Sequence, residues 1–425
     1  MTISITLFTF LYFAMWCILS FVHIVRKDKT YKFTKFNPHK PRVSILLPCR
    51  DEEKVVADAV RQCLNQTYED FEVIVVAHNC RDETFEIAKQ FESDRVRVLK
   101  LETKESGKGL GLNYGLKFAK GDIIVYFDAD SLVEKEYIEK VVEAIYDGKY
   151  DLVQGKIIGG NPDYNRLCFF QHMENLIFLS FFWGGKQKLD LPAGLGGTGV
   201  TIKRSSLEKI GGFRNVLVED FDLCLRAELG NMKIGYRHDA VIYDEKVPYY
   251  HMLIKQRSRW CAGHFQLISE MAGRPKEFLR LLKKNPVDFL HLFSPFYNLC
   301  LWIGLFVGIG SFAVNSQVIL GNVWVVFFST PLSFFVLQTI LLQGLFLLVL
   351  KKECRTRSEF KRCAVNLPLF YIYTVHWFWV FWKALFLRDW KKTKMEHGFR
   401  GKTVVGAYTY KSLSAWPSDL FSCDL

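Results

Sequence analysis

Residues 123–130 read IIVYFDAD, an apolar run that ends in two acids separated by one residue. Such a short apolar run predicts a strand over residues 123–127 that is buried in a sheet. Because side chains alternate along a strand, Asp128 and Asp130 are expected to point the same way at its carboxyl end. Two converging carboxylates suit a divalent cation. The alternative is that Asp130 and Ser131 only cap the next helix.

Strands and helices are expected to alternate on both sides of this run. The pattern predicts strands at 43–47, 72–77, 96–99, 123–127 and 151–156, and helices at 53–64, 82–91, 109–119 and 135–146. Strand and helix in turn indicate a mainly parallel sheet that is covered on both faces. In such sheets ligands bind at the carboxyl ends of the strands.

Half of the 425 residues are hydrophobic, and they are concentrated in blocks at 3–25, 290–314, 323–350 and 364–387. The first three blocks are long enough to span a bilayer. The last contains Pro368, His376 and several tryptophans, so it either spans the membrane or forms a re-entrant or interfacial segment. The net charge of +12 comes mostly from basic stretches beside these blocks, which anionic lipid explains better than a nucleic-acid partner.

The blocks define the expected domains. These are a transmembrane helix at 1–30, an α/β domain at 31–274, an amphipathic interface segment at 275–289, transmembrane helices within 290–387 and a tail at 388–425. Basic residues at 26–35 follow the first block, which places the α/β domain in the cytoplasm by the positive-inside rule. We therefore expect a multi-pass protein of the cell membrane.

Polar turns follow the first strands, where an α/β sheet binds nucleotides. The first turn contains Arg50, whose guanidinium could meet an anionic group, although a capping box at a surface turn is the plainer interpretation. Another turn contains His78 and Asp82. Residues 106–109 read SGKG, in which Lys108 is suited to a phosphate or base contact but lacks the spacing of a phosphate-binding loop.

Three further segments could carry chemistry. Residues 194–199 form a glycine-rich loop that would let a sugar chain approach the backbone. Asp220, in the stretch VEDFD at 218–222, is a plausible general base for a sugar hydroxyl, although acids at a helix start are often caps. In QRSRW at 256–260, an arginine could bind a diphosphate while Trp260 offers a flat apolar face to a sugar ring.

In this order, PCRDEE at 48–53, DAD at 128–130, ED at 219–220 and QRSRW at 256–260 resemble the motifs of the family 2 inverting glycosyltransferases. The resemblance runs from about residue 41 to 263, and the flanking apolar blocks are similar to those of the cellulose, chitin and hyaluronan synthase branch. It implies a GT-A α/β domain between transmembrane helices.

The resemblance also assigns roles to residues. It implies that Asp220 is the base beside Glu219, and that Asp130 and Asp128, with His397 in the tail, contact Mg²⁺ or Mn²⁺. Nucleotide contacts are implied for the following residues: Pro48, Arg50, Glu52, His78, Asp82, Lys108, Asp128, Gln256 and Arg259. Gly197, Thr198 and Trp260 are expected on the acceptor side.

One position departs from the family pattern, because many members have aspartate where this chain has His78. That aspartate recognises uracil and ribose, so the identity of the nucleotide, expected to be UDP, is left open. A neutral histidine could still bind a base edge, and donor binding would then weaken below about pH 6.5.

Two acceptors fit the resemblance. The favoured one is the end of a growing β-linked polysaccharide. The alternative is a membrane lipid that receives one sugar, as in ceramide glucosyltransferases, because few candidate spans are present for a polymer channel.

Overall fold

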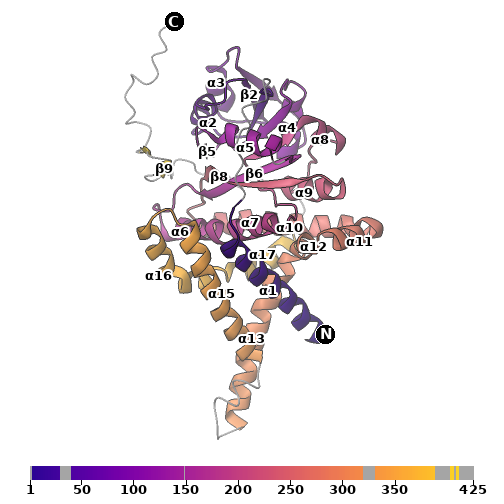
Figure 1. The fold of residues 1–425 in the computed structure, drawn as a ribbon, viewed down its shortest axis with the longest axis vertical. Coiled ribbons are helices and arrows are strands. Elements are labelled where there is room, and N and C mark those ends of the chain that lie inside the picture. Colours follow the sequence, from indigo (N-terminus) through magenta and orange to yellow (C-terminus); the bar gives the residue numbers. More distant parts are fainter. Residues whose placement is uncertain are drawn as a thin grey trace.

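The computed structural model describes residues 2–28, 40–147, 149–318, 331–387, 403–405 and 408–410. An α/β domain lies above a layer of helices, and further helices extend away from that layer on its other side (Figure 1). The short strands β9 (Thr403–Val405) and β10 (Tyr408–Tyr410) pair with each other. His397 and the segment 388–402 lie outside the described residues.

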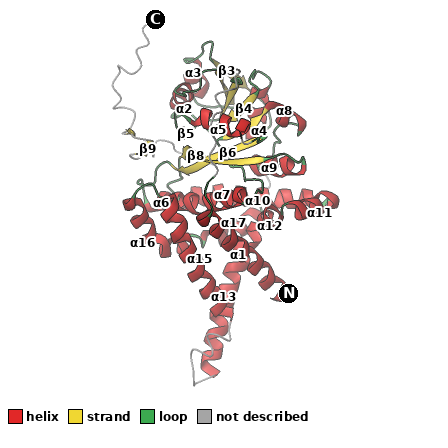
Figure 2. Cartoon of the chain, viewed as in Figure 1, coloured by secondary structure: helices red, strands yellow, loops and turns green. Residues whose placement is uncertain are grey.

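The α/β domain is built on one sheet with the strand order β3-β2-β1-β4-β7-β6-β8-β5 (Figure 2). The strands are β1 (Val43–Cys49), β2 (Phe71–His78), β3 (Val96–Leu101), β4 (Ile123–Tyr126), β5 (Leu132–Val133), β6 (Leu152–Gly159), β7 (Val200–Lys203) and β8 (Ile234–Asp244). The five strands expected from apolar runs are all present. Four of them bury their side chains almost completely, and all eight residues of β2 are buried, whereas β3 at the end of the sheet is only half-buried.

The sheet is mainly parallel, as expected, because β6 and β8 are parallel to each other and run in the same direction as β1 to β4. Strands β1 to β4 are parallel to one another, whereas β7 runs antiparallel to both β4 and β6, and β5 runs antiparallel to β8. The sheet is therefore mixed. The antiparallel strands β5 and β7 escaped prediction because they are short, and the parallel strand β8 escaped it because it bulges at the polar residues that follow Arg237.

Helices cover the sheet, and their apolar stripes explain where they lie. They are α2 (Val56–Leu64), α3 (Thr84–Lys89), α4 (Lys108–Leu116), α5 (Tyr137–Asp147), α8 (Arg204–Lys209) and α9 (Glu219–Leu229). In α5, for example, Ile138, Val141, Val142 and Ile145 recur at helical spacing and are all fully buried. Burying such a side chain stabilises the fold by about 1.5–3 kcal/mol.

A layer of helices separates the domain from the apolar part of the chain. It contains α6 (Arg166–Glu174), a π-helical turn η1 (Asn175–Leu179), α7 (Ser180–Lys188), α10 (Tyr250–Ala272), α11 (Pro275–Lys284) and α12 (Pro286–Leu292) (Figure 1). Helix α11 is amphipathic. It buries Leu281 fully, exposes Leu279 and Leu282 in part, and ends in Lys283 and Lys284.

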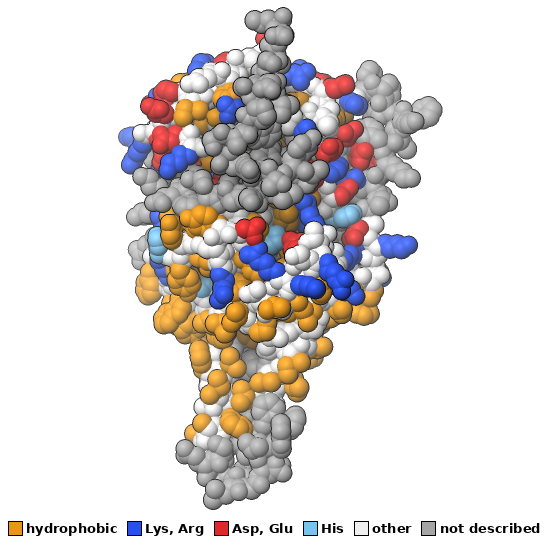
Figure 3. Space-filling view, turned by 90° about the vertical axis from the view of Figure 1, so that its left-hand side faces the viewer, with side chains coloured by type: hydrophobic (Ala, Val, Ile, Leu, Met, Phe, Trp, Pro, Cys, Tyr) orange, Lys and Arg blue, Asp and Glu red, His pale blue; other side chains and the backbone are white. Residues whose placement is uncertain are grey.

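Below this layer lie α1 (Thr2–Val25), α13 (Ser294–Val318), α15 (Pro331–Glu353), α16 (Arg357–Tyr373) and α17 (His376–Leu385). Among the described residues, Leu7–Val25 and Ser294–Val314 are long and apolar enough to cross a membrane. Hydrophobic side chains dominate this lower part of the surface, beneath a belt that includes many lysines and arginines (Figure 3).

The last apolar block is not one helix. It is broken between α16 and α17 at Thr374 and Val375. Helix α17 packs against α10, which belongs to the layer of helices beneath the α/β domain. Whether this block spans the membrane stays a prediction.

Ion pairs tie the first helix to the rest of the chain. His23 Nε2 lies 2.8 Å from Glu353 Oε1, although the two residues are 330 positions apart. The other carboxylate oxygen of Glu353 accepts a hydrogen bond of 2.5 Å from Lys156 of strand β6. Asp28 pairs with Lys188 at 2.7 Å. These contacts join α1, α15 and the α/β domain.

Candidate active site

Lys108 is the centre of a charged cluster beyond the carboxyl end of strand β4. Its ammonium lies 2.5 Å from Asp128 Oδ1 and 3.6 Å from Glu219 Oε1. It also donates a hydrogen bond to the carbonyl of Gly197, and it lies 5.0 Å from the centroid of the buried Tyr126 ring. Burial alone would lower the pKa of Lys108, but Asp128 and Glu219 outweigh burial and raise it. Lys108 is therefore a fixed cation between two acids.

Gly197 brings the glycine-rich loop into the same cluster. A Cβ placed on Gly197 would lie within 4 Å of Asp128 Oδ2, Lys108 Nζ and Asp220 Oδ2, at 3.7, 3.8 and 3.9 Å. The hydroxyl of Thr198 accepts from the backbone N–H of Asp128 at 3.1 Å. A side chain at 197 would therefore stand between the acids, and glycine keeps that space open.

Glu219 and Asp220 begin helix α9, as the sequence predicts. The N–H of Phe221 donates to Asp220 Oδ1 at 2.8 Å. Burial, and then the neighbouring Glu219 charge, raise the pKa of Asp220 to about 7. A carboxyl group with a pKa near neutrality is well matched to accept a proton in catalysis.

Helix α10 carries residues 256–260 and packs directly against the segment before Asp220. A Cβ on Gly263 would lie 2.6 Å from the methyl groups of Val218, so only glycine permits this approach. Next to this contact, Phe221 of α9 stacks on His264 of α10 with ring centroids 4.9 Å apart. These contacts fix the position of α10 relative to the two acids.

The two arginines of QRSRW differ in surroundings. Arg257 is buried, donates a hydrogen bond of 2.6 Å to Glu174 Oε2 and lies 4.1 Å from the centroid of the Trp260 ring. Tyr373 donates to the same Glu174 oxygen at 3.0 Å. Arg257 thus anchors α10 to α6 and α16 and stacks on Trp260. Arg259 and Gln256 are half-buried on the same helix.

The turns after β1 and β2 lie side by side and form the other flank of the site. A Cβ on Gly111 would lie 3.5 Å from Pro48 Cβ and 3.9 Å from His78 Cβ. Burial lowers the pKa of His78, so the ring is neutral at pH 7. The backbone N–H of the buried Glu52 donates to the hydroxyl of Thr84 at 2.7 Å. Arg50, two residues earlier in the same turn, is half-buried.

Asp82 stabilises the turn through hydrogen bonds to its backbone. Its carboxylate accepts from the N–H of Glu53 and from the N–H of Thr84, each at 3.1 Å. This explains why an aspartate is present here, and it leaves Asp82 a weaker candidate than His78 for contacting a base.

Asp128 and Asp130 were expected to point the same way because side chains alternate along a strand, but both residues lie beyond the end of β4. Strand β4 ends at Tyr126, and residues 129–130 form a turn in which Ser131 N donates to the carbonyl of Asp128 at 3.1 Å. A helix cap at Asp130 and Ser131 is also wrong, because β5 follows and α5 begins only at Tyr137. Asp130 is half-buried in this turn.

Several supporting residues were not found from the sequence. They are Tyr126 under Lys108, Gln154, Glu174 and Asn215. Gln154 is fully buried, accepts from Gly196 N at 2.8 Å and donates to the Thr198 carbonyl at 3.0 Å, and so holds the glycine-rich loop. A single buried glutamine or glutamate carries no motif, so no signal in the sequence could have found these residues.

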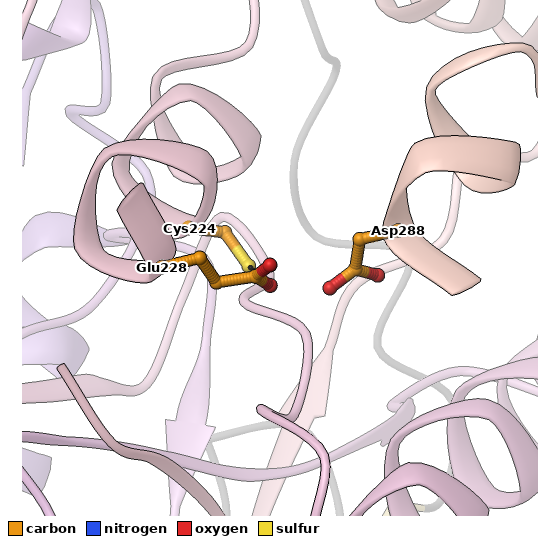
Figure 4. Close-up of side chains that lie close together, drawn as sticks. All are labelled: Cys224, Glu228 and Asp288. Carbon is orange, nitrogen blue, oxygen red and sulfur yellow. Dashed lines mark hydrogen bonds between the residues drawn. The ribbon is translucent and has the colours of Figure 1, made fainter. Parts of the chain in front are cut away.

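A second cluster of charged side chains lies between α9 and α12 (Figure 4). Ligand atoms of Cys224, Glu228 and Asp288 lie within 4.8 Å of one another. The buried Lys186 lies 2.5 Å from both carboxylate oxygens of Asp288, so its ammonium already supplies the cation. Burial, and then Asp288, raise the pKa of Glu228 to about 10, which keeps that group neutral. The cluster is a structural link that holds α7, α9 and α12 together.

A mixed α/β sheet with acids at the carboxyl ends of its strands is compatible with a nucleotide-binding domain. Residues 44–211 match the family model described as Glycosyl transferase family 2. This part of the chain is therefore similar to the family 2 glycosyltransferases, and it is an enzyme domain of the glycosyltransferase type.

Three curated relatives extend this match. The chain is 28% identical over 284 residues to the probable glycosyltransferase YdaM of Bacillus subtilis, which covers 65% of this chain and 66% of that one. It is 30% identical over 237 residues to a beta-monoglucosyldiacylglycerol synthase of Trichormus variabilis, with 53% and 49% covered. It is 24% identical over 231 residues to the poly-beta-1,6-N-acetyl-D-glucosamine synthase of Staphylococcus epidermidis, with 53% and 55% covered. The chain thus spans about half to two thirds of these relatives.

One solved structure has the same fold. The mannosyltransferase PcManGT from Pyrobaculum calidifontis, solved with GDP-Man and Mn²⁺, has a TM-score of 0.55 and 17% identity, with 90% of this chain and 96% of that chain covered. The likeness includes the helices outside the α/β domain, since residues 44–211 alone are well under 90% of the chain.

Proposed function

We propose that this protein transfers a sugar, with inversion, from a nucleotide donor to a hydroxyl group of an acceptor held at a membrane. The observation that carries the proposal is the cluster in which Asp128, Lys108, Glu219 and Asp220 surround the open position at Gly197. Acids that converge on a cavity beside a fixed cation are suited to binding a metal diphosphate and removing a proton.

Asp220 is the proposed base, because inversion requires a group that takes the proton of the attacking hydroxyl. Its pKa of about 7 means that near neutral pH a large part of the population is ionised and able to accept this proton. Glu219 holds that pKa up through its negative charge and binds Lys108.

A divalent metal fits the acids of the site. Asp128 places one oxygen at Lys108 and the other toward Gly197, and Asp130 is in the same turn. Carboxylate oxygens are the ligands that Mg²⁺ and Mn²⁺ prefer, so these two residues would hold either ion. When bound, the ion would neutralise the diphosphate oxygens.

The nucleotide is proposed to lie across the carboxyl ends of β1 and β2. Pro48, Arg50, Glu52 and His78 flank this edge on one side and Lys108 on the other. Gln256 and Arg259 of α10 are proposed to face the diphosphate end, and Trp260 the acceptor. A neutral His78 can accept or donate a hydrogen bond to a base edge, which is compatible with UDP.

Two acceptor classes have support of different kinds. Similarity to a named polysaccharide synthase supports a growing glycan. Similarity to a named glycolipid synthase supports a lipid. The tryptophans of α17 that could line a glycan channel are exposed, at 61% for Trp379 and 44% for Trp382, which suits a membrane-interface position better.

The test is nucleotide release by the purified chain in detergent, with a panel of UDP- and GDP-sugars and Mn²⁺. We expect one donor to be turned over, and Asp220→Asn to reduce this turnover at least a hundredfold, as loss of a general base does. Glu208→Gln, an exposed acid on α8, is the matched control and should keep the parental rate. The proposal fails if no donor is turned over, or if Asp220→Asn and the parent are equally active.

A further inference from the structure

An open groove of about 820 Å³ lies between the segment before α9 and the helices α10, α13 and α17. Its walls come from the segment before α9, from one face of α10, from the start of α13 and from the end of α17. Characteristic lining residues are Leu217, Phe265, Ile268, Phe296, Leu385 and Leu387. None of the described residues that line it carries a charge. The volume is in the range of pockets that hold small organic ligands.

One end of the groove is lined by residues that lie close in sequence to Lys108 and Asp220 of the catalytic cluster. Its lining includes Ser106, which lies two residues before Lys108, and Asn215, whose side-chain oxygen packs against Gly107. Leu217 belongs to the short segment that leads into Glu219 and Asp220, and its N–H donates to Gln266 at 3.3 Å. Three polar lining residues, Ser106, Asn215 and Gln266, therefore lie at this end, on the side of the proposed base.

The other end reaches the apolar part of the protein. Phe296 belongs to α13, whose segment Ser294–Val314 is apolar and mostly exposed. Leu385 is 49% exposed, and Phe386 beside it is 83% exposed. The amphipathic helix α11 packs on α10 nearby and ends in lysines, as helices at a membrane surface do. The groove thus opens where acyl chains would be present.

We infer that this groove binds the acyl chains of the acceptor, and that the acceptor is a membrane glycerolipid whose free hydroxyl lies at Asn215 and Asp220. This inference rests on the proposed transferase function and deepens it. A glycan chain would find few hydrogen-bonding partners along Phe265, Phe296 and Leu385, whereas acyl chains can pack against these apolar side chains without leaving a polar group unpaired.

Ser269→Trp is the variant of choice, because Ser269 is exposed and lines the groove, so an indole there would fill the groove without disturbing the core. Ala272→Trp places the same side chain at an exposed position of α10 outside the groove lining and is the matched control. Leu385→Gln is a second variant that makes the opening polar at nearly constant volume.

Transfer is measured in detergent micelles with two acceptors that share a headgroup, dioleoylglycerol and dibutyrylglycerol. We expect Ser269→Trp to lower kcat/KM for dioleoylglycerol about tenfold through KM, and Leu385→Gln to lower it less. Both variants should leave kcat/KM for dibutyrylglycerol and the affinity for the nucleotide unchanged, and Ala272→Trp should match the parent throughout. Equal losses for the two lipids, or no loss in Ser269→Trp, would overturn the inference.

Retention of radiolabelled dioleoylglycerol by the purified chain is measured separately, without a donor. Retention that falls in Ser269→Trp but not in Ala272→Trp supports the groove even if the donor has been wrongly chosen. If the parent releases nucleotide but a soluble β-linked tetrasaccharide displaces the lipid, the groove holds glycan and the inference fails while the transferase function stands. If neither nucleotide release nor nucleotide binding is detected, the proposed function fails instead.

Discussion

The ammonium of Lys108 lies 2.5 Å from Oδ1 of Asp128, and the same ammonium lies 3.6 Å from Glu219. A lysine at the start of α4 thus neutralises acids from the end of β4 and from the start of α9. The cluster depends on this one side chain, because a buried acid without a partner is costly.

Lys108→Met should therefore lower both stability and nucleotide binding. We expect the free energy of unfolding to fall by about 3 kcal/mol, since the acids lose their buried partner. Thermal unfolding in detergent and titration with UDP or GDP would measure the two effects. Lys104→Met, in the exposed part of the same loop, is the control. A stable Lys108→Met variant with parental nucleotide affinity would contradict the arrangement.

The activity should depend on pH through Asp220. The profile of kcat/KM should rise with pH and level off above about 7, because the base works only when it is ionised. Glu219→Gln removes a negative charge that holds the pKa of Asp220 up, so the rise should move to lower pH. Glu208→Gln should leave the profile in place. A rise that stays at the same pH, or moves upward, in Glu219→Gln would show that another group titrates.

Gly263→Ala tests the contact between α10 and the segment before Asp220. The added methyl would lie 2.6 Å from Val218, and overpacking of this kind typically costs about 1–3 kcal/mol. We expect kcat to fall while the affinity for the nucleotide stays close to parental. Val218→Ala in the same chain should restore much of the activity. Gly273→Ala, where a methyl meets only ordinary contacts at 3.4 Å and beyond, should be neutral.

Glu174→Gln tests whether Arg257 acts as an anchor. Without the carboxylate, the guanidinium loses its 2.6 Å partner and the stack on Trp260 loosens. We expect KM for the acceptor to rise about tenfold, equivalent to about 1.4 kcal/mol, with KM for the donor unchanged. Tyr373→Phe removes only a neutral donor from Glu174 and should have a smaller effect. A rise in donor KM instead would indicate that Arg257 faces the diphosphate.

Apolar runs were sufficient to predict β1, β2, β4 and β6, because each of these strands is buried on both faces and therefore reads as a continuous hydrophobic segment, while the end strand β3 alternates buried and partly exposed residues at its start. Strand β8 could not be found in this way. Its register against β6 shifts after Gly155, so the polar stretch that follows Arg237 bulges out of a pattern that would otherwise be regular.

The acids of the site were predictable from their motifs, but their partners were not. Lys108 was expected to contact a phosphate, and the structure pairs it with Asp128. That pairing depends on how two loops pack across the end of the sheet. Likewise, the contact of Arg257 with Glu174 exists only because α6 and α10 belong to one layer, which no local spacing in the sequence encodes.

The pairing of His23 with Glu353 has a consequence for how the chain is made. Helix α1 is synthesised before the other described helices, and the partner of His23 follows 330 residues later. Until α15 emerges, this polar end of the first helix must be accommodated by lipid headgroups, water or a folding factor. This contact of the helix bundle therefore forms late in synthesis, and a chain that stops before Glu353 would leave both His23 and Lys156 without this partner.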